Sequence, residues 1–144
     1  MFLEYLGRFT RALENFEGPQ VAEWSRPYPS AMLSNVLIIA REEVVAALLG
    51  LMVELRGLQP RFPEVGESID GAIERFLPTA VVIDCDHADC NEQLFEAIRR
   101  AGAVPILFSP YRIQTEVQEV AARHGTRSFT LPTDPDTFAK ILGV

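Results

Sequence analysis

Three short, unbroken apolar runs constrain the fold of this chain more than any other feature of its sequence. They cover residues 36–40, 80–83 and 104–108 and consist mainly of valine, isoleucine and leucine. Such runs are typical of strands that are buried on both faces of a parallel sheet. Amphipathic segments separate the runs, so the sequence predicts an α/β fold in which strands and helices alternate.

Two weaker strands complete the predicted sheet. Segment 58–65 contains Pro60 and Pro63, and proline cannot donate to a strand ladder, so we place this strand at one edge. Segment 127–131 alternates polar and apolar residues, which suits the opposite edge. Together the strands predict a doubly wound, five-stranded parallel sheet of order 2-1-3-4-5 with right-handed crossovers.

Five helices are expected to connect and follow these strands, over residues 41–56, 67–76, 91–101, 113–124 and 134–142. Glycine follows three of them, as Gly57, Gly102 and Gly125, each just before a strand. Glycine readily adopts the left-handed conformation that closes a helix, so these residues support the predicted boundaries. In the first helix the apolar side chains are expected to share one side; they are Val44, Val45, Leu48, Leu49, Met52 and Leu55.

Residues 1–34 form an extension that precedes the alternating pattern, which occupies residues 35–144. Large apolar residues recur at alternating steps of four and three, the spacing of a helical seam; they are Phe2, Leu6, Phe9, Leu13 and Phe16. Gly18 and Pro19 end the expected helix, and a proline-containing connector follows. Two interpretations stay open: the helix packs on its own domain, or it forms a dimer seam.

Length, composition and charge limit the kind of protein. A chain of 144 residues with 48% hydrophobic residues can build one domain with a sizeable core. No apolar run approaches the roughly 20 residues that span a bilayer, and no signal-peptide pattern occurs at the N-terminus. Two cysteines suggest a reducing compartment. We expect a cytoplasmic protein without a membrane partner, and the net charge of −7 disfavours direct nucleic-acid binding by this domain.

Polar residues stand at the carboxyl ends of three predicted strands. Arg41 and Glu42 follow the first strand, Asp84 follows the third, and Ser109 follows the fourth. In a sheet of this order the ligand crevice lies where the winding reverses, at the ends of strands 1 and 3. We therefore expect these residues to converge. The simpler alternative is that Asp84 only caps the next helix or bonds loop amides.

These features resemble the receiver domain of two-component response regulators, which has a flavodoxin-like fold. The resemblance covers about residues 35–144 and rests on element order and on segments 78–84 and 104–109. It implies that Asp84 holds the phosphoacceptor position and Ser109 the position of the hydroxyl that contacts the phosphoryl group. It also implies that Phe129 is the switch aromatic, with Ser128 as a competing match.

The same resemblance suggests how the protein meets its partners. The usual interaction surface of the family is formed by the fourth helix, fifth strand and fifth helix, which here correspond to residues 113–124, 127–131 and 134–142. We expect a protein partner or a self-dimer at this surface or through the N-terminal helix. The chain stops soon after the last helix begins, so we expect a domain of a longer protein whose output region is absent.

Several residues depart from the receiver pattern. The acidic pair that holds Mg²⁺ in the family is replaced by Ala40 and Arg41, and Leu131 stands where the family has a lysine before proline. Phosphoryl transfer to a carboxylate needs cations to stabilise the charge on the transferring oxygens. We expect no cofactor and hypothesise that Arg41 pairs with Asp84 and replaces the ion. If Mg²⁺ does bind, its ligands are expected to be Glu42, Asp84 and Asp86.

We therefore predict an atypical receiver-like signalling module that is not an enzyme, acts through protein contacts and is not phosphorylated by the usual magnesium route. Two alternatives stay open. One is an active receiver phosphorylated on Asp84, and the other is a domain that binds a small anion through Arg41 and Ser109. Arg112 is expected on a solvated helix face.

Other chemistry finds less support in the sequence. Cys85, His87 and Cys90 are a candidate zinc or redox cluster, but their number and spacing do not match zinc sites or thiol oxidoreductases. No glycine-rich loop follows the first strand, which disfavours nucleotide binding.

Overall fold

The computed structural model describes residues 34–143. The expected extension over residues 1–34 therefore lies, except for Ser34, outside the described residues. The elements follow in the order β1 (Asn35–Ile39), α3 (Glu43–Leu55), β2 (Gln59–Arg61), α4 (Ile69–Phe76), β3 (Ala80–Asp84), α5 (Glu92–Arg100), β4 (Val104–Ser109), α6 (Gln114–His124), β5 (Arg127–Thr130) and α7 (Pro135–Leu142).

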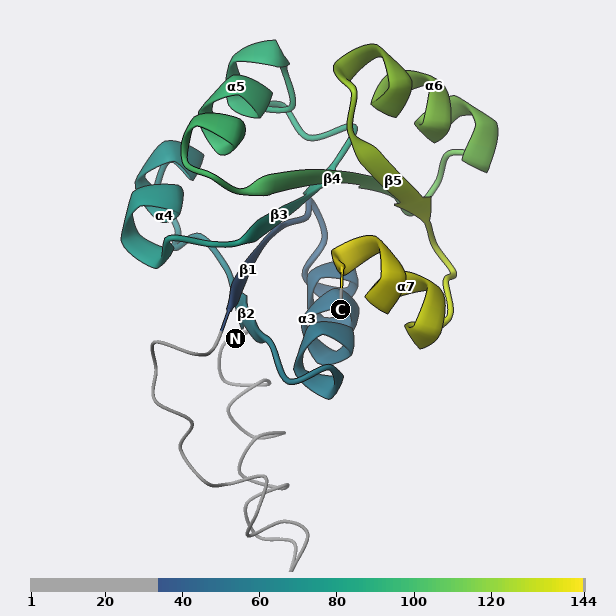
Figure 1. Ribbon diagram of the computed structural model, residues 1–144, viewed down its shortest axis with the longest axis horizontal. Helices are drawn as coiled ribbons and strands as arrows, with labels where there is room; N and C mark the ends of the chain where they lie inside the picture. Colours follow the sequence, from purple (N-terminus) through teal and green to yellow (C-terminus); the bar gives the residue numbers. More distant parts are fainter. Residues whose placement is uncertain (1–33, 144) are drawn as a thin grey trace, which may run out of the picture. The chain divides into compact units, whose positions relative to one another are not determined.

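The five strands form one sheet in the order β2-β1-β3-β4-β5. All four neighbouring pairs are parallel, with Ile38 beside Val82 and Val82 beside Ile106 in the centre. Helices α4, α5 and α6 cover one face of the sheet, and α3 and α7 cover the other (Figure 1). This arrangement confirms the predicted fold class and strand order.

The three apolar runs form the core. Every residue of β3 is buried, as are the last four residues of β1 and the last five of β4. The large side chains of Phe95, Phe108 and Phe138 fill the space between the sheet and its helices on both faces. Only two buried residues of the described chain are polar or charged, Asp84 and Ser109, and both lie at carboxyl ends of central strands.

Helix boundaries follow local backbone chemistry. Gly57, Gly102 and Gly125 all have positive φ angles just after α3, α5 and α6, as predicted. The helix predicted from residue 67 begins later, at Ile69, because Ser68 is its N-cap and accepts a hydrogen bond from the Gly71 amide at 3.0 Å. The strand predicted over residues 58–65 is also shorter, since pairing is limited to β2.

Helix α3 differs from the expectation that its apolar residues share one side. Leu49 and Met52 are buried, but Val44, Leu48 and Leu55 are exposed to solvent. The helix is thus apolar on its outer side as well as on the side that packs against the sheet. Within residues 34–143, no helix is long and apolar enough to cross a membrane.

Candidate functional site

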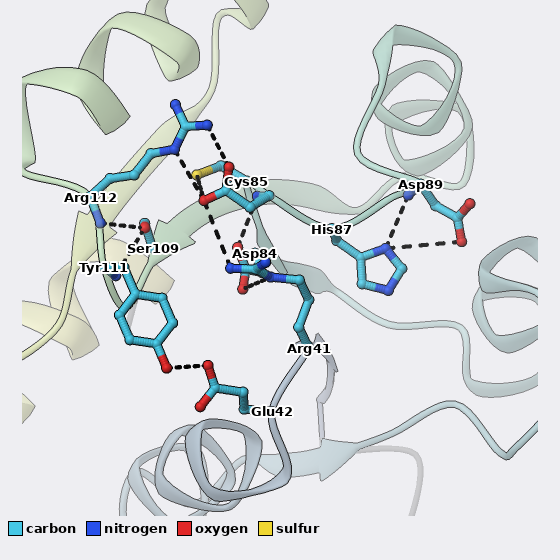
Figure 2. A network of polar contacts seen from close by, with 10 residues as sticks. Arg41, Glu42, Asp84, Cys85, His87, Asp89, Ser109, Tyr111 and Arg112 are labelled. Carbon is cyan, nitrogen blue, oxygen red and sulfur yellow. Dashed lines mark hydrogen bonds and ion pairs between the residues drawn. The ribbon is translucent and has the colours of Figure 1, made fainter.

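Asp84 lies at the centre of the polar residues that the sheet brings together. As the last residue of β3 it is 1% exposed, and both carboxylate oxygens accept hydrogen bonds. Oδ1 accepts from the backbone amide of Asp86 at 2.8 Å, and Oδ2 accepts from Nε of Arg41 at 3.0 Å. Figure 2 shows the Arg41 side chain reaching from the loop after β1 to Asp84. The first and third strand ends therefore meet through a guanidinium–carboxylate pair.

Arg41 extends the pair toward a second carboxylate. Its Nη2 lies 3.9 Å from Oδ2 of Asp86, so the guanidinium lies between the two aspartates. The hydrogen bond to Asp84, followed by the negative charge of that residue, raises the pKa of Arg41 above its already high ordinary value. Arg41 is therefore a permanent cation at this edge of the sheet.

Asp86 is held from its other side by Arg112. Nε of Arg112 donates to Oδ2 of Asp86 at 3.0 Å and Nη2 donates to Oδ1, so the pair is bidentate. The hydrogen bond from Arg112 lowers the pKa of Asp86 below its ordinary value. Arg112 is exposed to solvent as expected, but its expected place on a helix is wrong, because this residue precedes α6 in the loop after β4.

Ser109 fixes the loop that carries Arg112. Its side chain is buried, and Oγ accepts hydrogen bonds from the backbone amides of Tyr111 at 3.2 Å and Arg112 at 2.9 Å. These bonds turn the chain just beyond β4. The Tyr111 hydroxyl donates in turn to the carboxylate of Glu42, and this hydrogen bond raises the pKa of Tyr111. The loops after β1 and β4 are thus joined directly (Figure 2).

Phe129 lies in the core and not at the rim of the site. It is buried, stacks on Phe108 at 5.5 Å between ring centroids, and meets Phe138 edge-on at 5.2 Å. Side chains alternate along a strand, so Phe129 faces α7, while its half-buried neighbour Ser128 faces the other side beside Leu107.

The position before Pro132 carries no charge. Leu131 stands there, its amide donates to the Ser109 carbonyl at 3.2 Å, and the Leu131–Pro132 peptide is cis. The sequence contains a single lysine, Lys140, and it lies in α7. No lysine is therefore available at the end of β5, and the cations beside Asp84 and Asp86 are both arginines.

The cysteines do not form the zinc cluster that their proximity in sequence suggested. Within residues 34–143, the metal-ligand types that converge are Asp84, Cys85 and Asp86, without His87 or Cys90. Both cysteines are free and half-buried. Burial raises the pKa of Cys90 to about 11 and also raises that of Cys85, so neither thiol is an activated nucleophile.

Mg²⁺ is the ion that a receiver-like fold implies, and the residues present do not fit it. The three candidate ligands already have partners: Arg41 on Asp84, Arg112 on Asp86 and Tyr111 on Glu42. Mg²⁺ requires oxygen ligands in near-octahedral geometry at about 2.1 Å. Asp84 and Asp86 are each already hydrogen-bonded to a guanidinium group, so an ion bound by both carboxylates would compete with these contacts.

Several solved structures that are similar to this chain are receiver domains. A CheY-like receiver domain protein from Methanospirillum hungatei has a TM-score of 0.58 at 18% identity, covering 75% of this chain and 89% of its own. The signal receiver domain of a modulated diguanylate cyclase from Desulfovibrio desulfuricans has 0.61 at 19% identity, covering 77% and 91%. A response regulator from Thermotoga maritima has 0.62 at 13% identity, covering 78% and 100%.

Comparison by sequence does not extend this result. No protein-family model and no curated protein matches the chain. At identities below 20% the structural likeness concerns the fold and not the residues of the site. The described part of this chain therefore has the flavodoxin-like fold of CheY-like response-regulator receiver domains.

Proposed function

We propose that this domain is a pseudo-receiver, a signalling module in which Arg41 replaces the divalent cation and Asp84 is not phosphorylated by the magnesium-dependent route. The contact between Arg41 Nε and Asp84 Oδ2, at 3.0 Å, is the observation that carries the proposal. A guanidinium neutralises the buried carboxylate without an ion. It also occupies Oδ2, one of the two oxygens with which Asp84 could bind a metal ion.

The same contact removes what phosphoryl transfer needs from Asp84. In-line attack by a carboxylate on a phosphoryl group requires a free oxygen and cations that neutralise the transferring group. Both oxygens of Asp84 accept hydrogen bonds, and the residue before Pro132 is the apolar Leu131. Arg41 and Arg112 are cations, but each is already paired with an aspartate.

The surrounding contacts support a module with one fixed conformation. Tyr111 joins the loop after β4 to Glu42, and Arg112 joins it to Asp86. These contacts connect all three loops at the carboxyl ends of β1, β3 and β4 (Figure 2). We infer that the loop before α6 is held in place by side chains of this chain and does not respond to a phosphoryl group.

Such a module acts through protein contacts. Tyr111 and Ile113 are large apolar side chains that are exposed in the loop leading into α6. They border the surface formed by α6, β5 and α7, which in receivers is the usual site of partner binding. We propose that a protein partner binds this surface, with the contacts of Tyr111 to Glu42 and of Arg112 to Asp86 keeping its border in place.

Incubation with a small phosphodonor and Mg²⁺, followed by intact-mass measurement, tests the proposal. The expected result is an unchanged mass for the wild type and for Asp84→Asn alike. A phosphoryl adduct on the wild type that Asp84→Asn lacks would overturn it and support an active receiver. Stabilisation by inorganic phosphate without Mg²⁺, lost in Arg41→Ala, would overturn it in favour of an anion-binding domain.

A further inference from the structure

The last residue of α6, His124, is held by three residues of α5. Its ring stacks on the ring of Phe95, with the centroids 4.5 Å apart and the planes 26° from parallel. Nδ1 of His124 lies 2.5 Å from Oε2 of Glu92, and the backbone carbonyl of His124 accepts a hydrogen bond from Nη2 of Arg99. Glu92, Phe95 and Arg99 follow at steps of three and four residues, so they share one side of α5. This side of α5 therefore fixes the C-terminal end of α6.

The imidazole of His124 can gain a proton without losing a contact. An ionised carboxylate only accepts, so Nδ1 donates to Glu92, and in the neutral ring Nε2 carries no hydrogen. Nε2 has no hydrogen-bond partner within residues 34–143, so a proton added there breaks no bond. Protonation turns the contact with Glu92 into a charge-assisted pair, which is stronger than a hydrogen bond from a neutral ring.

Two further features favour the protonated ring. His124 ends α6, where unpaired carbonyl groups give the helix a partial negative charge. The ring of Phe95 is stacked on the imidazole, and the face of an aromatic ring attracts a cation. The end of α6 is therefore a place where a positive charge on His124 is stabilised from more than one side.

The charges around this histidine come from the two helices. Glu92 is the one that contacts an imidazole nitrogen, and the two arginines oppose protonation. The sheet adds no charge, because β4 has no charged residue and Arg127 of β5 binds the Ile141 carbonyl. The charged residues of α5 and α6 close to His124 are Glu92, Glu96, Arg99 and Arg123.

We propose that His124 is a pH-dependent latch between α5 and α6, which tightens when its imidazole gains a proton. The latch opens when the last turn of α6 frays, since helix ends open locally at little cost. In the closed state the ring contacts Glu92 and Phe95, and in the open state it loses both. The closed state therefore binds the proton more tightly. The latch strengthens as the pH falls through the range of about 5–8 in which histidine titrates, and weakens as the pH rises.

The latch acts on an element that the proposed function also uses. Helix α6 forms part of the surface proposed for a protein partner, so the pH would determine how firmly the end of this helix is held. None of the three contacts of His124 with α5 involves the residues around Asp84. The inference therefore does not rest on the pseudo-receiver proposal, and the two can fail independently.

NMR titration of the His124 ring, whose signal is identified by its loss in His124→Phe, tests the pair. Glu92→Gln is expected to lower the pH at which half of these rings are protonated by at least about 0.3, the effect of a partly exposed ion pair. Glu119→Gln is the matched control, because it removes the same charge from the exposed side of α6. An equal change in both variants, or no change in Glu92→Gln, would overturn the proposal.

Hydrogen exchange of the full chain tests the latch itself. The amides of residues 121–124, with each rate divided by its intrinsic rate at the same pH, are expected to be about two- to fourfold better protected at about pH 5.5 than at about pH 8. His124→Phe keeps an aromatic ring beside Phe95 but cannot titrate, so it should remove this pH dependence. Wild-type protection that does not change with pH, or a change that His124→Phe retains, would show that His124 is not a latch.

Discussion

Nε of Arg41 lies 3.0 Å from Oδ2 of Asp84, so a side chain of the protein itself supplies the positive charge beside the residue in the phosphoacceptor position. The pair joins the loop after β1 to the end of β3. Asp84 is almost fully buried, whereas the Arg41 side chain is 41% exposed. Without the pair, the buried Asp84 carboxylate would lack a counter-charge, whereas the exposed Arg41 guanidinium would still be hydrated.

Removing Arg41 is expected to destabilise the fold through Asp84. Arg41→Ala leaves a buried carboxylate without its counter-charge, which should lower the free energy of unfolding by about 1–3 kcal/mol. In an Asp84→Asn background, Arg41→Ala should lower the free energy of unfolding by less. Urea denaturation of the wild type, both single variants and the double variant should give a coupling energy of about 0.5–2 kcal/mol. Arg56→Ala, which breaks the exposed pair with Asp136, is the control and should cost no more than about 1 kcal/mol. Equal costs of Arg41→Ala in both backgrounds would show that the two residues do not interact.

The Arg112–Asp86 pair should give a stability contribution that acid removes. Arg112 lowers the pKa of Asp86 in the folded state, so the pair stabilises the protein above the ordinary aspartate pKa of about 3.9. The contribution is lost as the pH falls through the lower folded pKa. Arg112→Ala should therefore reduce the free energy of unfolding by up to about 1 kcal/mol near neutral pH and by progressively less below about pH 4.

Urea denaturation across this pH range measures the effect. Arg123→Ala, which removes an exposed arginine of α6, is the matched control and should give no such pH dependence. A difference between wild type and Arg112→Ala that stays constant down to about pH 2 would contradict the assigned partner of Asp86.

The contribution of Glu54 of α3 to stability should have the opposite pH dependence. Burial raises the pKa of its carboxyl group, so the folded state holds the proton more tightly than the unfolded state does. Stability then falls as the pH rises from the ordinary glutamate pKa of about 4.3 through the raised folded value. Glu54→Gln should increase the melting temperature near neutral pH and lose this advantage in acid. Glu119→Gln on the exposed side of α6 serves as control, and a similar gain from both variants would mean that burial of Glu54 is not the cause.

Phe129 should contribute to stability as a core residue. It packs against Phe108 and Phe138, so Phe129→Ala should lower the free energy of unfolding by about 3–5 kcal/mol. Tyr111→Ala, which truncates an exposed aromatic residue at the rim, should cost at most about 1 kcal/mol. Chemical denaturation compares the two, and a small cost for Phe129→Ala would be incompatible with its packing.

The fold was predictable because its signals are local. Three buried strands appear as unbroken apolar runs, and glycines 57, 102 and 125 mark helix ends where the backbone needs a positive φ angle. Ser68 caps α4, so the helix begins two residues later than its apolar periodicity predicts. The strand that contains Pro60 lies at the edge of the sheet, as the limit that proline sets on ladder pairing predicts.

The site was less predictable because it depends on loops. The sequence placed Arg41 beside Asp84 through strand order alone, and the structure brings the two together. The pairs Arg112–Asp86 and Tyr111–Glu42 were not predicted, since they need the turn that Ser109 makes after β4. The sequence feature that could have predicted these pairs is the position of Ser109 at the end of a central strand. A serine there can accept hydrogen bonds from the amides two and three residues later and so turn the chain back over the crevice. Periodicity also misassigned Val44 and Leu48 of α3, because a helix that is apolar on two sides gives no single stripe.

Titration of the wild-type protein with Mg²⁺, monitored by the backbone amide signals of Asp84 and Asp86 in NMR spectra, tests the central claim most directly. The Arg41–Asp84 pair predicts no saturable shift of either signal at Mg²⁺ concentrations up to the order of 10 mM, whereas Arg41→Asp, which returns a carboxylate to the loop after β1, should respond. Saturable shifts of both signals in the wild type at low millimolar Mg²⁺ would show that the ion displaces Arg41, and would contradict the proposal that this guanidinium takes its place.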